Sequence, residues 1–153
     1  MMIQKGNTMY IKIKKTDQNA VIPTYGSTEA AGCDLYALLD TDDIAIQPGE
    51  TKLVHTGISM EIPSGYYGGV YARSGLASKR GLRPANCTGV IDADYRGEIM
   101  VALHNDSGKT QTIQNHERIA QLIIEAYRRA DFLVVDDLAD TERGEGGFGS
   151  TGK

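Results

Sequence analysis

The amino-acid sequence predicts an all-β domain, folded as a sandwich or barrel, with one short helix and a flexible glycine-rich C-terminal tail. The first observation behind this prediction is a series of short segments with the apolar patterns of strands. The second is that turns containing Gly or Pro separate these segments. The third is size, because 153 residues, 41% of them hydrophobic, suffice for one core of ordinary size and indicate a single domain.

The first half of the chain contains four segments that we expect to form strands. Apolar and polar residues alternate in the first of them, as they do along a strand with one buried face. A turn built on Pro48 and Gly49 precedes the last one, and Gly57 within it indicates a β-bulge. The expected strands are Met9–Lys14, Gly32–Leu39, the region of Ile44 and Ile46, and Thr51–Ile62.

The middle of the chain holds a further strand and the one expected helix. Tyr66–Ala72 follows a Pro-Ser-Gly turn and is strand-like. Ser74–Arg80 is expected to be the helix, with Ser74 as its N-cap, because a serine side chain can accept a hydrogen bond from the first turn.

Two more predictions concern the second half of the chain. Val90–Ile91 and Ile99–Leu103 flank turn residues Asp94–Gly97, which indicates a β-hairpin with a longer loop. Arg118–Arg129 has good helix propensity, but it is short and lies among strands. We therefore expect it to be a strand.

The last eleven residues, Arg143–Lys153, contain five glycines, two cations, a Ser-Thr pair and one aromatic ring, Phe148. With so little apolar surface they cannot fold alone. They do offer backbone N–H groups, hydroxyls and positive charge, which a flap closing over a nucleotide triphosphate needs. Gly147–Lys153 also spells G-x-x-x-x-G-K, but a P-loop needs a strand before this pattern and Ser or Thr and a helix after it, so an ATPase is not favoured.

An acidic segment, residues 136–142, precedes this tail. We expect a β domain over residues 1–135, followed by a linker and mobile flap over residues 136–153. On composition alone, an inert disordered terminus is the competing interpretation.

Composition and charge exclude several classes of protein. The net charge of −4 and the lack of a basic stripe argue against a nucleic-acid partner. No apolar run approaches the roughly 18–20 residues of a membrane span, and no signal peptide is apparent, so we expect a cytoplasmic protein. Cys33 and Cys87 are too far apart for a C-x-x-C pair and are expected to be reduced. His116 and Glu117 begin an H-E-x-x-H pattern that lacks its second histidine.

Asp92 and Asp94 are the remaining candidates for acid–base chemistry, although an Asp near a tight turn is more often a turn former. Five segments taken together strengthen the case for an enzyme. In order, content and spacing they resemble the five motifs of the homotrimeric deoxyuridine triphosphate nucleotidohydrolases, the dUTPases. These segments are AGCDLYA (31–37), ARSGLA (72–77), GVIDADYRG (89–97), RIAQL (118–122) and RGEGGFGSTG (143–152).

The resemblance implies a jelly-roll fold and hydrolysis of dUTP to dUMP and pyrophosphate. It implies that Asp92 activates the water that attacks the α-phosphorus, whereas Asp94 forms the turn. It implies a Mg²⁺ cofactor held by the three phosphates and by waters, one of which contacts Asp34. It also implies a homotrimer whose sites combine segments of different subunits, with the tail reaching a neighbour.

The resemblance further assigns the substrate contacts. Backbone and side chains near the hairpin would read uracil, a tyrosine would pack on deoxyribose, and the tail would stack its ring on the base and hold the γ-phosphate. The expected substrate-binding residues are Arg73, Ser74, Gly75, Asn86, Val90, Ile91, Tyr95, Met100, Gln121, Arg143, Phe148, Gly149, Ser150 and Thr151.

Three of these residues also have ordinary structural interpretations. Ser74 could serve only as an N-cap, Gln121 could be an interior amide bonded to backbone, and Tyr95 could be a strand aromatic. Two other functions stay open at the level of the sequence. One is a dCTP deaminase on the same fold, and the other is a non-catalytic protein that senses nucleotides and signals to a partner.

Overall fold

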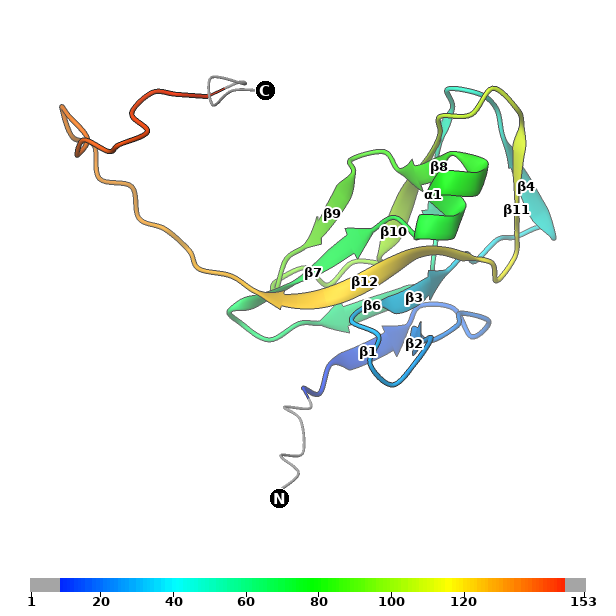
Figure 1. The fold of residues 1–153 in the computed structure, drawn as a ribbon. Helices are drawn as coiled ribbons and strands as arrows, with labels where there is room; N and C mark the ends of the chain where they lie inside the picture. Colours follow the sequence, from blue (N-terminus) through cyan, green and yellow to red (C-terminus); the bar gives the residue numbers. More distant parts are fainter. Residues whose placement is uncertain (1–8, 148–153) are drawn as a thin grey trace, which may run out of the picture.

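The computed structural model describes residues 9–147 as an all-β body with one short helix, which confirms the predicted fold class (Figure 1). Four sheets share the strands, in the orders β2-β3-β12-β7-β9, β5-β10-β8, β1-β6 and β11-β4. The elements are β1 (Lys12–Lys15), β2 (Thr24–Tyr25), β3 (Cys33–Tyr36), β4 (Asp43–Ile46), β5 (Thr51–His55), β6 (Ile58–Glu61), β7 (Tyr66–Tyr71), α1 (Ser74–Arg80), β8 (Leu82–Pro84), β9 (Thr88–Ile91), β10 (Met100–Asn105), β11 (Gln111–Gln114) and β12 (Arg118–Ala126).

The core lies between the five-stranded and the three-stranded sheets. Leu35 of β3 and Leu122 of β12 enter it from one sheet, and Val101 and Leu103 of β10 enter it from the other. Along β10 every second residue is buried, as the two-residue period of a strand requires. Leu76 is the buried residue of α1 and fastens the helix to this core.

β12 is the central strand of the five-stranded sheet and confirms the strand predicted within Arg118–Arg129. It pairs antiparallel with β3 on one side and with β7 on the other. Its helix-favouring composition is overridden because burial between two neighbouring strands decides the conformation. In Figure 1 it runs through the middle of the body, so residues on it are held on both sides.

Two sequence predictions of strand pairing were wrong. Thr51–Ile62 is two strands in different sheets, because β5 pairs with β10 whereas β6 pairs with β1. The segments on either side of Asp94–Gly97 do not form a hairpin, since β9 pairs with β7 and β10 pairs with β5 and β8. The intervening loop therefore crosses from one sheet to another. Sequence periodicity reports strands but not their partners.

Smaller differences concern the ends of elements. The first strand begins at Lys12 instead of Met9, and Tyr10 is almost fully exposed. The predicted helix Ser74–Arg80 is confirmed, but its N-cap is Arg73, and no side chain makes a capping hydrogen bond. Gly81 ends the helix in the left-handed conformation, which glycine adopts without a steric penalty.

Gly57 forms the corner between β5 and β6. Its φ is +67°, and a Cβ there would lie 2.5 Å from Leu38 Cδ2 and 2.7 Å from Ala20 Cβ. We expect Gly57→Ala to destabilise the domain by about 3 kcal/mol, because backbone strain and overpacking add. Gly49→Ala is the matched control, since Gly49 also has a positive φ but open space around it, and about 1 kcal/mol is expected. The midpoint of urea-induced unfolding measures both; equal shifts would contradict the packing argument.

The chain leaves the body after β12. Residues 127–147 contain no helix or strand and extend away from the sheets (Figure 1). The side chains of Phe132, Leu133, Val134 and Leu138 are more than four-fifths exposed. Among residues 9–147, no helix is long and apolar enough to cross a membrane.

Candidate functional site

A pocket of about 470 Å³ gathers five of the predicted site residues. Its position follows from the sheet order β3-β12-β7. Gln121 of β12 lies opposite Asp34 of β3 on one side and opposite Tyr71, the last residue of β7, on the other. The chain then passes through Arg73 into α1, which brings three more residues to the same place. The predicted residues that line this pocket are Asp34, Arg73, Ser74, Gly75 and Gln121.

Asp34 is held by two arginines within this pocket. Its Oδ1 accepts a hydrogen bond from Arg73 Nε at 2.8 Å, and its Oδ2 accepts one from Arg118 Nη1 at 3.3 Å. The Asp34 side chain is only 13% exposed, so the two guanidinium groups replace most of the water that an ionised carboxylate would otherwise need. The carboxylate is thereby fixed at the mouth of the pocket.

The start of α1 contributes backbone N–H groups to this pocket. The first N–H groups of a helix have no partner within the helix, and they favour an anion. Ser74 and Gly75 occupy the first two helical positions and are exposed. From the sequence we expected Ser74 to be the N-cap, but the N-cap is Arg73 and Ser74 is the first helical residue. Its hydroxyl therefore makes no capping hydrogen bond.

Gln121 fits both interpretations that the sequence allowed. Its amide bonds to the backbone, and its side chain also lines the pocket. Its Nε2 donates to the Ala72 carbonyl at 2.9 Å. A Cβ at Gly32 would lie 2.8 Å from Gln121 Oε1, so the glycine leaves room for the amide. This bond fixes the side chain beside the residue that precedes Arg73.

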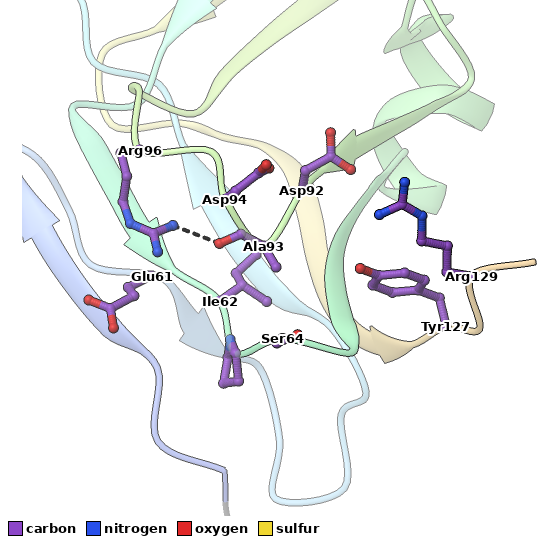
Figure 2. Close-up of a pocket in the computed structure, with 10 residues that line it drawn as sticks. Glu61, Ile62, Ser64, Asp92, Ala93, Asp94, Arg96, Tyr127 and Arg129 are labelled. Atoms are coloured by element: carbon purple, nitrogen blue, oxygen red, sulfur yellow. Dashed lines mark hydrogen bonds between the residues drawn. The ribbon is translucent and has the colours of Figure 1, made fainter.

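Asp92 lies elsewhere, in a second pocket of about 710 Å³ (Figure 2). Asp92–Tyr95 is a tight turn in which the Tyr95 N–H donates to the Asp92 carbonyl at 3.1 Å. The Asp92 side chain is exposed, and its carboxylate has no hydrogen bond within residues 9–147. Tyr127 and Arg129, from the segment that follows β12, line the same pocket. Both were absent from the sequence prediction, because they lie between two motifs.

Glu98 anchors the far end of the Asp92 loop. Its carboxylate accepts hydrogen bonds from His55 Nδ1 at 2.9 Å and from the N–H groups of Thr56 and Gly57. Burial raises the pKa of Glu98, but the bonds from His55 and from the backbone outweigh burial and bring the pKa below its ordinary value. This anchor could not be predicted from the sequence, because its partners lie 41 to 43 residues earlier in the chain.

The residues expected near the base are spread over β9, the turns before and after it, and the start of β10. Asn86 is exposed in the turn before β9, and the Val90 side chain is 60% exposed. Ile91 is partly buried and packs against the core. Tyr95 Oη donates to the Glu98 carbonyl at 2.9 Å, and Met100 is half-buried on β10 opposite His55. Neither pocket brings Asn86, Val90 and Met100 together.

The tail residues are only partly described. Arg143 Nε donates to the Gly146 carbonyl at 2.7 Å, so within the described chain Arg143 bonds to its own segment. Phe148, Gly149, Ser150 and Thr151 lie outside the described residues.

The residues present fit a metal ion that is held mainly by a bound phosphate compound and by water, with few protein side chains. Within residues 9–147 no cluster of three or more His, Cys, Asp or Glu side chains could hold an ion. Asp34 is the one carboxylate among the described residues that line the pocket beside α1. A single carboxylate suits Mg²⁺, which keeps several waters and takes other oxygen ligands from phosphates.

Of the predicted site residues, five line one pocket and Asp92 lines another, and the two pockets share no described lining residue. One offers cations and helix N–H groups, and the other offers an exposed carboxylate. Cationic residues that the sequence analysis did not assign, Lys79, Arg80 and Arg118, also line the first pocket. Two of these residues could have been found from the sequence. Lys79 is a basic residue in the last turn of the predicted helix, and Arg118 is the first residue of the segment RIAQL.

Fold and site together define a class: an all-β domain with a cation-lined pocket beside the start of α1 and a separate pocket that holds an exposed carboxylate. Comparisons with known proteins give the family. The family model described as dUTPase matches residues 18–152, and the chain therefore belongs to the dUTPase family.

Individual relatives agree with this assignment. The chain is 50% identical over 145 residues to the deoxyuridine 5′-triphosphate nucleotidohydrolase of Nautilia profundicola, covering 95% of this chain and all of that one. It is 46% identical to the enzyme of the same description from Escherichia phage T5, over 93% and 98% of the two chains. A solved mutant dUTPase of Staphylococcus bacteriophage 80alpha with dUpNHpp superposes with a TM-score of 0.85 at 28% identity, over 95% and 100% of the two chains. The expectation of a dUTPase is thus confirmed.

Proposed function

We propose that the chain hydrolyses dUTP to dUMP and pyrophosphate, with Asp92 activating the attacking water. The observation that carries the proposal is the pocket beside α1, where Arg73, Ser74 and Gly75 offer a guanidinium, a hydroxyl and helix N–H groups to an anion. The printed descriptions of its relatives as deoxyuridine 5′-triphosphate nucleotidohydrolases support the same reaction, as does a related fold solved with dUpNHpp.

The phosphate chain of the substrate would lie along this pocket. Arg73 would pair with phosphate oxygens, and Gln121 would border the phosphates from β12. Asp34 would accept a hydrogen bond from a water of the Mg²⁺ hydration shell. When bound, Mg²⁺ supplies neutralisation of the charge that develops on the phosphates.

Asp92 would act as the general base. An exposed carboxylate that makes no bond in the described part of the chain can accept a proton from a bound water and give it up again. The tight turn and the Glu98 anchor hold its backbone in place. Because the water must attack in line with the leaving pyrophosphate, this positioning contributes as much as the carboxylate itself.

Uracil recognition would use the backbone of β9 and the loop that follows. β9 is the edge strand of the five-stranded sheet, and an edge presents unpaired N–H and C=O groups. Such groups can pair with the edge of uracil as another base would, whereas cytosine would leave donors facing donors. Asn86 and Met100 would flank the base, Val90 and Ile91 belong to the strand itself, and Tyr95 would exclude a 2′-hydroxyl.

We further propose that the sites are assembled in a homotrimer. Separation of the phosphate pocket from Asp92 within one chain supports this arrangement, since one site would need residues of both. The exposed apolar run Phe132–Val135 is a second argument, because a monomer seldom exposes four large apolar side chains in a row. In this assembly residues 136–153 form the linker and flap that carry Arg143, Phe148, Gly149, Ser150 and Thr151 to a neighbour's site.

Removal of residues 143–153 is expected to lower kcat by about 10²-fold, because several hydrogen-bond donors to the phosphates would be lost. Steady-state kinetics with dUTP measures the loss. Light scattering should show the same oligomer as the full chain, since the apolar run is retained. Full activity of the truncated chain would show that the tail is inert.

The overall proposal is tested by pyrophosphate release from dUTP, dCTP, dTTP and UTP, with and without Mg²⁺. We expect turnover of dUTP alone, dependent on Mg²⁺. Ammonia release from dCTP would identify a deaminase, and tight binding of dUTP without turnover would identify a nucleotide sensor. Either of the last two results would overturn the proposed hydrolysis.

A further inference from the structure

Asp34 and Arg73 are bonded to each other, although the proposed function gives each of them a different ligand. Arg73 would bind phosphate, and Asp34 would face a water of the metal shell. Their hydrogen bond of 2.8 Å uses the Arg73 Nε–H and one carboxylate oxygen. A triphosphate that recruits the Arg73 Nε–H must compete with Asp34 for it, whereas the terminal N–H groups of Arg73 remain available to a phosphate.

Release of Arg73 has a cost, which depends on what remains around Asp34. The Asp34 side chain is 13% exposed, and a carboxylate so nearly buried is unfavourable without a partner. Removing one partner of such a pair costs more than the pair itself contributes, because the remaining charge is left poorly solvated. A second cation at Asp34 would remove most of this cost.

Arg118 is that second cation. Its Nη1 donates to Asp34 Oδ2 at 3.3 Å, the oxygen that Arg73 Nε does not use. The Arg118 carbonyl in turn accepts a hydrogen bond from Arg73 Nη1 at 3.4 Å, so Arg118 adjoins both members of the pair. Its side chain is about half exposed, which lets it adjust while Arg73 changes partner.

The other cations of the pocket are placed differently. Arg80 is committed to the Glu117 carboxylate and to the Thr112 carbonyl. Lys79 is exposed and makes no ion pair within residues 9–147, so it is a candidate for direct contact with a polyanion, not with Asp34. Among the described residues, Arg118 and Arg73 alone make ion pairs with Asp34.

We infer that Arg118 is a positioning residue: it keeps Asp34 paired and oriented while Arg73 transfers from Asp34 to the phosphates of the incoming nucleotide. The inference rests on the proposed function. It predicts that Arg118 acts on nucleotide binding through Asp34 and not by touching the nucleotide.

A double-mutant cycle tests this role by metal-free binding of dUpNHpp, measured by calorimetry in EDTA. Arg118→Gln is expected to weaken binding about tenfold, because Asp34 would lose its remaining partner when Arg73 moves. In an Asp34→Asn background the same substitution is expected to change binding by less than about twofold, since no charge is left to pair. Arg118→Lys should restore part of the lost affinity in the first background only.

Lys52→Gln is the matched control, because it also removes one positive charge and one ion pair, with Glu50, on a strand away from the pocket. It should leave binding within about twofold. An equal loss for Arg118→Gln in both backgrounds overturns the positioning role and indicates direct contact with the phosphates. A wild-type protein that fails to bind dUpNHpp overturns the proposed function itself, which separates the two failures.

Discussion

Replacing Asp92 by Asn is expected to lower kcat for dUTP by about 10³-fold, while dUpNHpp binds within about threefold of wild type. The two side chains have the same shape, so the turn from Asp92 to Tyr95 should persist. The amide cannot accept a proton from water, so the loss falls on the chemical step. Single-turnover kinetics together with calorimetry separate binding from chemistry.

Asp94→Asn is the matched control. Asp94 lies two residues away on the same loop, is exposed like Asp92 and lines the same pocket. Its substitution removes the same charge, but we expect kcat within about threefold of wild type, since an exposed charge that does not take the proton acts only through an electrostatic effect that solvent and salt screen. Equal losses for the two variants would attribute the effect to charge, and an unchanged kcat for Asp92→Asn would remove Asp92 from the mechanism.

The sequence alone predicted the parts of the structure that depend on neighbouring residues. The helix Ser74–Arg80 was predicted with its bounds, because a serine at a helix start is a local signal, although the N-cap is Arg73 and not Ser74. The strand within Arg118–Arg129 was also predicted correctly, although its helix propensity pointed the other way. Here the strand-rich context was a better guide than propensity, since burial in a sheet decides the conformation.

Contacts between residues far apart in the chain could not be predicted from the sequence. Gly57 was expected to interrupt one strand, yet it joins two sheets, and only its contacts with Leu38 and Ala20 reveal the corner. The hairpin around Asp94–Gly97 failed for the same reason, because turn chemistry does not specify which strands pair. The short strands β2, β8 and β11 were missed because two to four residues carry too little periodicity.

The same distinction between local signals and long-range contacts applies to the candidate site. The motifs selected Asp34, Arg73 and Gln121, which the fold brings into one pocket at β3, β12 and the segment that follows β7. Their mutual contacts were not predictable, and it is these contacts that single out Arg118. The separation of this pocket from Asp92 was likewise invisible in the motif order, although the resemblance to a trimeric family had implied that sites are shared.

Co-expression of two inactive variants is expected to restore part of the dUTP turnover. Asp92→Asn lacks the proposed base, and Arg73→Gln lacks a phosphate ligand, so each homotrimer should be nearly inactive. If every site takes Asp92 from one subunit and Arg73 from another, a hybrid trimer contains sites in which both residues are intact. Random assembly of equal amounts places the two intact residues together in about one quarter of the sites of a cyclic trimer. Purification through two affinity tags removes the homotrimers, and each remaining hybrid trimer contains one such site in three, so the purified hybrids should show about a third of wild-type turnover.

The recovery of turnover depends only on how the subunits share their sites, so a pair of variants that cannot complete a site serves as the control. Asp92→Asn co-expressed with a chain carrying both substitutions cannot form a site with both residues intact, and its activity should remain at the level of the parents. Light scattering of the doubly purified material establishes that hybrids formed. Hybrids as inactive as their parents would mean that each chain builds its own site, and the two pockets would then have to close on one another within a single subunit. Recovery would instead explain why the Asp92 carboxylate and the Asp34–Arg73 corner lie in separate pockets of one chain.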